Sequence, residues 1–346
     1  MSLSSEAPVI LSVEPSCALP GGEVRLHGRG LLTDLSRPAQ VCFGEAVATV
    51  VFGSPTQLTV LVPESAAGKS ISVRTPLGSS KAVFTLATLL SENLHPVANP
   101  AVDEESNVYV TFSGSRGQSV PTSLFRIDDG SELHPIAAEI MNPTGLALDG
   151  AGNLYISSRQ DGAVYRLSTS GELTTYAEGM GVATGIAFDV HGNLYVGDRS
   201  GTIFKIAPDR QIFVYATLEP SLAAYHLAFS PNGNLYVTGP TASSNDCVYE
   251  IDQKGAVTPF FSHLGRPQGL AFDRDGNLYV AASWRGRRGI LRITPGRQPS
   301  IVIGGINLVG LAFDPSHSLI VVTTSSAYFL PWTTEGFLFT PKLPEM

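Results

Sequence analysis

The stretch "FDRDGNLYVA", residues 272–281, decides the fold of this chain. Its D-x-D-G-N string suits either a calcium-binding loop or a tight turn between two strands. An EF-hand loop that starts at Asp273 needs glycine at its sixth position and a bidentate carboxylate at its twelfth. Leu278 and Trp284 stand there instead. The spacing therefore favours the turn.

The stretch is one copy of a repeat. Four strong copies read "TGLALDGAGNLYIS" from Thr144, "TGIAFDVHGNLYVG" from Thr184, "YHLAFSPNGNLYVT" from Tyr225 and "QGLAFDRDGNLYVA" from Gln268. Two weaker copies flank them, "ANPAVDEESNVYVT" from Ala98 and "VGLAFDPSHSLIVV" from Val309. The position of Asp273 is held in the other copies by Asp103, Asp149, Asp189, Ser230 and Asp314. Six copies about 40 to 46 residues apart predict the blades of a propeller.

Each copy has two apolar runs around a five-residue polar turn, which predicts a hairpin with a bulge. A positive φ is expected at the glycine of the four strong turns, namely Gly152, Gly192, Gly233 and Gly276. The Asp and Asn side chains should accept hydrogen bonds from nearby backbone donors. These carboxylates are therefore interpreted as structural, and no metal site is expected at the turns.

The composition allows two domains, because 346 residues with 43% hydrophobic and 15% charged side chains can bury large cores. Thirty-five glycines and 24 prolines favour short strands and turns over helices. A net charge of −8 argues against general attraction to nucleic acid or membranes, but does not exclude a local basic patch. No 18-residue apolar stretch is present. Cys17, Cys42 and Cys247 lack metal-ligand spacing, and a Cys17–Cys42 bridge is left open.

The first ten residues, "MSLSSEAPVI", lack the cationic start and apolar core of a secretory signal. The expected location is the cytoplasm, or an extracytoplasmic compartment if a signal peptide was removed. The sequence leaves both open.

Residues 7 to about 87 lack the repeat and show seven short alternating runs, which predict a β-sandwich. The motifs "PGGEVRLHGRGL" from Pro20, "VCFG" from Val41 and "VLVPESAAG" from Val60 resemble an IPT/TIG immunoglobulin-like domain. The resemblance implies a spacer, or a module that contacts glycans or proteins. We therefore expect an all-β chain with an immunoglobulin-like sandwich at 1–87 and a six-bladed propeller at 88–346.

From about residue 88 the repeats resemble those of NHL-repeat and gluconolactonase-like six-bladed β-propellers. The resemblance implies that "GLAFD" is the innermost strand of a blade and "NLYV" the second. Two segments could close the ring. We favour "GFLFTPKL" from Gly336 as the last outer strand, and the alternative is "FTLATLLSE" from Phe84.

In this arrangement the loops between second and third strands share one face, the top face, with the loops between blades. The insertions also fall there, and binding sites tend to lie on such loops. Gluconolactonase-like relatives place Glu, Asn and Asp around a divalent metal at this mouth. The matching positions hold Ala98, Thr144, Thr184, Tyr225, Gln268 and Val309. Since none is a carboxylate, neither a metal site nor another cofactor is expected.

Catalytic candidates are few. His226 and Tyr225 could act as base and hydrogen-bond donor at the channel mouth, and the simpler interpretation is that they fill the channel. No nucleophile elbow, zinc-binding H-E-x-x-H pair or P-loop is present.

Arginine gathers in the predicted top-face loops, where its planar fork suits carboxylate or phosphate. The candidate ligand-binding residues are Arg116, Arg159, Arg199, Arg266, Arg285, Arg287, Arg288, Gln268, Trp284, Asn142 and Asn307. They predict an anionic small molecule, a glycan or an acidic protein surface as the partner. The alternative is a solvated rim whose arginines pair with Asp161, Asp198 and Asp246.

Three functions stay open. The favoured one is a non-enzymatic binding or scaffold propeller that recognises an anionic ligand through its top face. The second is an atypical gluconolactonase-like hydrolase or lyase at the channel mouth. The third is an RNA-binding NHL-type propeller, which the net charge disfavours.

Overall fold

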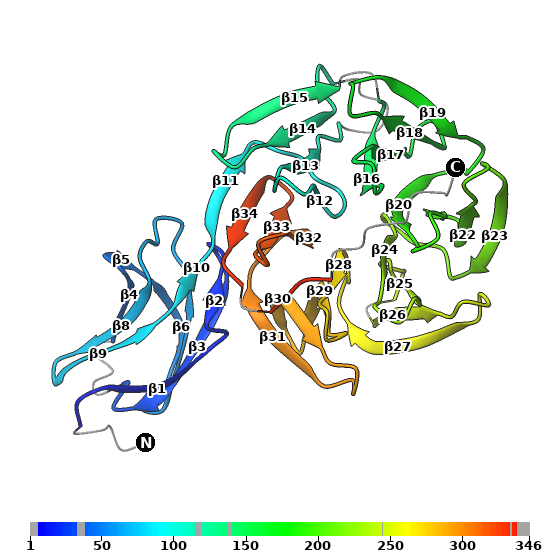
Figure 1. Ribbon diagram of the computed structural model, residues 1–346. Helices are drawn as coiled ribbons and strands as arrows, with labels where there is room; N and C mark the ends of the chain where they lie inside the picture. Colours follow the sequence, from blue (N-terminus) through cyan, green and yellow to red (C-terminus); the bar gives the residue numbers. More distant parts are fainter. Residues whose placement is uncertain are drawn as a thin grey trace. The chain divides into compact units, whose positions relative to one another are not determined.

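The computed structural model describes residues 6–32, 39–114, 120–137, 140–243, 245–332 and 334–337. Within these ranges the regular structure consists of β-strands, as the turn-rich composition predicts (Figure 1). None of the described residues belongs to a helix long and apolar enough to cross a membrane. The chain divides into two compact units. Unit 1 comprises Met1–Thr88, Arg285–Leu291 and Ser300–Ile306, and unit 2 comprises the rest.

Unit 1 is a two-sheet sandwich. One sheet has the order β1-β3-β7-β6, with β1 Val9–Glu14, β3 Glu23–Arg29, β7 Gln57–Leu61 and β6 Thr49–Gly53. The other has the order β5-β4-β8-β9, with β5 Ala46–Val47, β4 Gln40–Phe43, β8 Ser70–Thr75 and β9 Gly78–Val83. Residues of β3 alternate between buried and partly exposed, as expected for a strand with one face on a core. That core contains Phe43 and Phe84, whose rings meet edge to face at 5.0 Å. The predicted immunoglobulin-like sandwich is confirmed.

Unit 1 also contains strands from a distant part of the sequence. Strand β2 (Cys17–Ala18) pairs in parallel with β10 (Thr85–Leu86) and with β31 (Pro299–Gly304). The amide of Leu19 donates to the carbonyl of Gly304 at 2.9 Å. Glycine is required at position 22, because a Cβ there would lie 2.6 Å from the same carbonyl oxygen. Residues around 300 therefore complete unit 1.

The six repeats each form a blade, and all of them lie in unit 2 except for parts of the two outer strands of the fifth repeat, which belong to unit 1 (Figure 1). Blade 1 has β12 Ala101–Val102, β13 Val108–Thr111, β14 Leu124–Ile127 and β15 Leu133–Ala137. Blade 2 has β16 Pro143–Leu148, β17 Leu154–Ser158, β18 Ala163–Leu167 and β19 Leu173–Ala177. Blade 3 has β20 Ala183–Phe188, β21 Leu194–Asp198, β22 Thr202–Ile206 and β23 Ile212–Thr217. Blade 4 has β24 His226–Phe229, β25 Leu235–Thr238, β26 Asp246–Ile251 and β27 Val257–Leu264.

Blades 5 and 6 differ from this plain pattern. The fifth repeat forms β28 (Leu270–Phe272), β29 (Leu278–Trp284), β30 (Arg287–Ile293) and then β31. The sixth repeat forms only β32 (Leu308–Phe313), β33 (Leu319–Thr323) and β34 (Ser326–Leu330). Its fourth strand is β11 (Thr88–Glu92), which lies outside β34 in the same sheet. The ring is thus closed by a strand that precedes blade 1.

The preference for the segment at Gly336 as the closing strand was wrong. With β11 beside β34, the outer position of blade 6 is already filled. The described part of the C-terminal segment lies instead at the inner-strand turn of blade 5. There Gly336 bridges Asp273, and the amide of Phe337 donates to the carbonyl of Phe272 at 2.9 Å.

The inner turns have the predicted chemistry. Positive φ angles occur at Gly152, Gly192, Gly233 and Gly276, and also at Ser106 and His317 in the weaker copies. In blade 3, Asp189 accepts from the Asn193 amide at 2.9 Å, the Asn193 side chain at 2.7 Å and the Tyr195 hydroxyl at 3.1 Å. The same three bonds occur at Asp103, Asp149 and Asp273. The repeated carboxylate therefore holds a turn.

The repeat also explains how blades join. The tyrosine of one copy packs edge to face on the inner-strand phenylalanine of the next copy. Ring centroids are 4.8 Å apart for Tyr155 and Phe188, and 5.0 Å apart for Tyr195 and Phe229. Tyr236 and Phe272 repeat the contact at 4.8 Å. The motif thus encodes both the turn of a blade and its contact with the next blade.

Candidate functional site

The top face of unit 2 is the side that carries the loops between second and third strands and the loops between blades. Near the axis, inner strands approach so closely that glycine is required. A Cβ on Gly145 would lie 2.5 Å from the carbonyl oxygen of Thr184, and one on Gly185 would lie 2.2 Å from that of Tyr225. Neighbouring inner strands therefore pack backbone against backbone at these two positions.

None of the six mouth positions holds a carboxylate. Five of the six side chains are buried, namely Ala98, Thr144, Thr184, Tyr225 and Val309, and Gln268 is half-buried. The hydroxyl of Thr184 donates to the carbonyl of Gly197 at 2.7 Å and accepts from the amide of Tyr225 at 3.1 Å. These groups do not fit a hard divalent ion, which takes several anionic or carbonyl oxygens from its site.

His226 does not suit a general base. It is 2% exposed on β24, and burial lowers its pKa to about 3. Its Nδ1 has no hydrogen-bond partner among the described residues. The hydroxyl of Tyr225 donates to the carbonyl of Glu219, and burial raises the pKa of that tyrosine to about 12. Both side chains therefore support the channel-filling interpretation.

Arg159 and Asn142 meet on the top face of blade 2. Arg159 follows β17, and its Nη2 donates to Asn142 Oδ1 at 2.8 Å and to the carbonyl of Gly114 in blade 1 at 3.3 Å. Asn142 precedes β16, is 2% exposed and has a φ of 48°, which asparagine tolerates better than most residues. Its carbonyl accepts from the Arg159 amide at 3.3 Å.

Arg199 occupies the equivalent place in blade 3. Its Nη2 donates to the carbonyl of Leu222 at 2.8 Å, and its backbone amide donates to the carbonyl of Val182 at 3.3 Å. Asp198 accepts from the Val182 amide at 2.8 Å and also accepts from the Ser200 hydroxyl. The described hydrogen bonds of the Asp198 carboxylate thus come from an amide and a hydroxyl group. Asp161 and Asp246 likewise accept from neighbouring hydroxyl or amide groups.

The other predicted ligand-binding residues are scattered. Arg266 and Asn307 are exposed in loops between blades, with φ angles of 47° and 55°. Trp284 is half-buried at the end of β29, Arg285 is exposed in the turn that follows, and Arg288 is exposed on β30. Arg116 lies outside the described residues.

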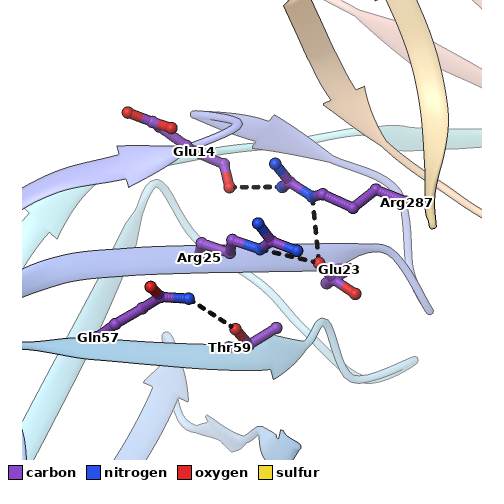
Figure 2. A network of polar contacts seen from close by, with 6 residues as sticks. All are labelled: Glu14, Glu23, Arg25, Gln57, Thr59 and Arg287. Carbon is purple, nitrogen blue, oxygen red and sulfur yellow. Dashed lines mark hydrogen bonds and ion pairs between the residues drawn. The ribbon is translucent and has the colours of Figure 1, made fainter. Parts of the chain in front are cut away.

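The prediction for Arg287 needs correction, because the residue lies in strand β30 and in unit 1. Figure 2 shows its guanidinium directed at two groups of that unit. Nη2 donates to the carbonyl of Glu14 at 2.9 Å, and Nε lies 3.1 Å from Glu23 Oε1. Arg25 Nε approaches the same oxygen at 3.2 Å. Burial and the nearby Arg25 lower the pKa of Arg287, so its charge belongs to a network rather than an open loop.

Two polar residues of interest were missed. Ser113, at the top of blade 1, is fully buried, and its hydroxyl has no hydrogen-bond partner among the described residues. Glu250, on β26, supplies the carboxylate that blade 4 lacks at Ser230, because it accepts from the Asn234 side chain at 2.7 Å. Glu250 pairs with Tyr236 on the neighbouring strand. This pairing depends on the strand register, which the repeat alone does not reveal.

One described cluster could hold a metal ion. Asp128, Glu132 and His134 lie on the hairpin of β14 and β15, with their ligand atoms within 4.8 Å of one another. The Asp128 carboxylate already accepts from His134 Nε2 at 2.7 Å and from the Glu132 amide at 2.8 Å. The hydrogen bond from His134 is the main cause of the lowered pKa of Asp128. The turn is thus stabilised by its own side chains.

Comparisons with known proteins agree with the two domains. Residues 8–89 match the IPT/TIG domain. No curated protein matches the sequence. An auxiliary nutrient binding protein from Bacteroides thetaiotaomicron is similar in structure, with a TM-score of 0.55 and 14% identity over 95% of this chain and 99% of that one.

Enzymes are also among the similar structures. A gluconolactonase from Xanthomonas campestris has a TM-score of 0.56 and 17% identity over 70% of this chain and 88% of that one. A catalytically inactive virginiamycin B lyase from Staphylococcus aureus has a TM-score of 0.52 and 12% identity over 96% and 98%. At these identities the likeness establishes the β-propeller fold alone. The fold is therefore shared by gluconolactonases, lyases and nutrient-binding proteins.

Proposed function

We propose that this protein is a non-enzymatic binding protein whose propeller recognises an anionic ligand through its top face. The observation that carries the proposal is the side-chain chemistry of unit 2. The mouth positions offer no carboxylate, and His226 is buried and neutral. Arg159 and Arg199 are held on the same face by carbonyl groups. A fixed guanidinium is suited to binding an anion.

The enzymatic alternative has support from the gluconolactonase and lyase structures of the same fold. A fold does not fix a function, however, and the site must supply the chemistry. A metal-dependent lactonase needs anionic oxygen ligands at the mouth, where none of the six positions of this chain holds a carboxylate. We therefore place binding above hydrolysis.

Two measurements on the purified protein test the proposal. Hydrolysis of D-glucono-1,5-lactone is followed with calcium, with zinc and with a chelator, and we expect no metal-dependent turnover. Binding of D-gluconate is measured by calorimetry at low and high salt, and we expect an affinity that falls with salt. Metal bound stoichiometrically together with metal-dependent turnover would overturn the proposal.

A charge-reversed variant locates the binding. Arg159→Glu with Arg199→Glu should abolish D-gluconate binding. Arg210→Glu with Lys254→Glu changes the net charge equally at exposed positions, and should leave the affinity within about twofold once salt screens long-range effects. Equal losses in both variants would mean that net charge, and not the top face, controls binding.

A further inference from the structure

Two buried polar atoms at the top of blades 1 and 2 lack a hydrogen-bond partner among the described residues: Asn142 Nδ2 and Ser113 Oγ. Buried donors are nearly always paired, so an unpaired one needs an explanation. The two lie at one place, because Arg159 Nη2 contacts both Asn142 Oδ1 and the carbonyl of Gly114, the residue after Ser113. They therefore belong to one local cluster.

The orientation of the Asn142 amide follows from its partner. A guanidinium only donates, so the amide atom 2.8 Å from Arg159 Nη2 must be the acceptor Oδ1. The Nδ2 group is then beside the guanidinium, with its hydrogens directed elsewhere. Exchanging the two amide atoms would place a donor against a donor. Among the described residues, the unpaired atom of this amide is therefore the donor Nδ2.

Blade 3 shows that the fold does not require unpaired donors here. Val182 stands where blade 2 has Asn142, and its amide donates to Asp198. Arg199 stands where blade 2 has Arg159, and it donates to carbonyl groups. The equivalent loops of blade 3 thus form without an unpaired side-chain amide. The Asn142 side chain is therefore not required for the fold of these loops.

The available groups indicate the chemistry of a ligand. Asn142 Nδ2 and Ser113 Oγ can donate hydrogen bonds, and Arg159 adds one positive charge. Asp161 lies in the same loop, where its carboxylate accepts from Ser158 and Tyr165 and opposes a second negative charge. The set suits a singly charged group with two acceptor oxygens better than a phosphate with nearly two charges.

We propose that Arg159, Asn142 and Ser113 bind the carboxylate of a small organic anion at the top of blades 1 and 2. The inference rests on the proposed function and assigns its ligand class and subsite. Arg159 is half-buried and marks the side open to solvent. Its contact with the Gly114 carbonyl, at 3.3 Å, is longer than its 2.8 Å contact with Asn142 Oδ1, so a shift of the guanidinium away from Gly114 would let a carboxylate oxygen reach the Asn142 amide.

The test uses acetate as the minimal carboxylate and acetamide as its uncharged counterpart. The side-chain amide signal of Asn142 is followed by NMR and assigned by its loss in Asn142→Gly, because glycine tolerates the positive φ of this position. We expect a saturable shift with acetate in the millimolar range, and none with acetamide. Inorganic phosphate should bind at least about tenfold more weakly.

Variants of the protein locate the subsite. For each variant the acetate dissociation constant is measured from the backbone amide signals that shift on titration. Arg159→Met and Asn142→Gly should each weaken acetate binding at least about tenfold, Ser113→Ala less, and the control Arg199→Met should not change it. No saturable shift of the Asn142 signal, or equal losses in Arg159→Met and Arg199→Met, would overturn the subsite. If Asn142→Gly still binds D-gluconate and only the double arginine variant loses it, the subsite is overturned and the proposed function stands. Metal-dependent lactone turnover would overturn the proposed function.

Discussion

In each of the four strong repeats, one carboxylate binds the asparagine of the inner turn. In blade 4 this carboxylate comes from a different position in the sequence. In blade 3 the carboxylate is Asp189, which joins the turn to Asn193 and Tyr195. In blade 4 the residue is Ser230, and Glu250 binds the equivalent asparagine from the neighbouring strand. Burial and a hydrogen bond to Glu250 raise the pKa of Tyr236. Two different sequence positions therefore supply one structural role.

Asp189 and Ser230 occupy equivalent positions in the repeat, but replacing them should lower the free energy of unfolding by different amounts. Asp189→Ala should destabilise unit 2 by about 2–4 kcal/mol, because buried partners lose bonds to a charged group. Glu250→Ala should also be costly, whereas Ser230→Ala should cost less than about 1 kcal/mol. Thermal midpoints of the three variants check the ranking, with exposed Glu172→Ala as control. A Ser230→Ala loss as large as that of Asp189→Ala would contradict this account.

His226 makes the stability of the propeller depend on pH. Burial lowers its pKa to about 3, below the ordinary 6.5 of the unfolded chain. The unfolded state therefore binds more protons between these values, and stability falls as pH drops below about 6.5. At pH 4.5 the loss is at most about 2.7 kcal/mol.

His226→Asn should remove this part of the pH dependence. The measurement is the free energy of unfolding between pH 7 and pH 4.5 for both proteins. Exposed His191→Asn serves as the control and should retain the slope of the unmodified protein. Parallel curves for His226→Asn and the unmodified protein would show that His226 is not the cause.

At the scale of elements, closure of the ring depends on pairings that are distant in sequence. Strand β11 takes the outer place in blade 6, and the segment around Gly336 reaches the inner turn of blade 5. Glu335 Oε1 pairs there with Arg274, and it lies 3.4 Å from His317 Nε2. The repeat predicts what a blade contains, but two candidate segments of similar apolar character compete for one strand position. Only the pairing itself distinguishes them.

Gly336 should be the least replaceable residue of the C-terminal segment. A Cβ at this position would lie 2.2 Å from Phe313 Cβ, and Phe313 is buried. Gly336→Val should therefore displace the segment, at a cost of about 1–3 kcal/mol. Hydrogen exchange checks this directly, because the Phe337 amide that donates to Phe272 should exchange faster.

A matched substitution controls for the loss of glycine itself. A Cβ on Gly296 would approach its nearest neighbour, Thr294 Oγ1, at 3.7 Å, which is an ordinary contact. Gly296→Ala should leave the exchange of the Phe337 amide unchanged. Unaltered exchange in Gly336→Val would mean that the segment adapts around the added methyl groups.

For the whole molecule, the sequence predicts local patterns and misses pairings between distant segments. The six turns, their glycines and the alternating runs of the sandwich are local patterns, so residue periodicity is enough to place them. The role of residues 300–306 in unit 1 depends on the pairing of β31 with β2, a strand near the start of the chain. The candidate site shows the same limit. The arginines led to the prediction of an anionic ligand, but only the contacts separate Arg159 on the top face from Arg287 in the Glu23 network.

Two neighbouring arginines on β30 should therefore behave differently. Arg287 contacts Glu23 and the Glu14 carbonyl (Figure 2), and 14% of its side chain is exposed. Arg288 is exposed. Arg287→Met keeps much of the apolar stem but removes the donors, and should lower stability by about 1–2 kcal/mol. Arg288→Met should change it by less than about 0.5 kcal/mol. Denaturant unfolding of the full chain measures both, and equal stabilities would show that the network is too well solvated to hold unit 1 together.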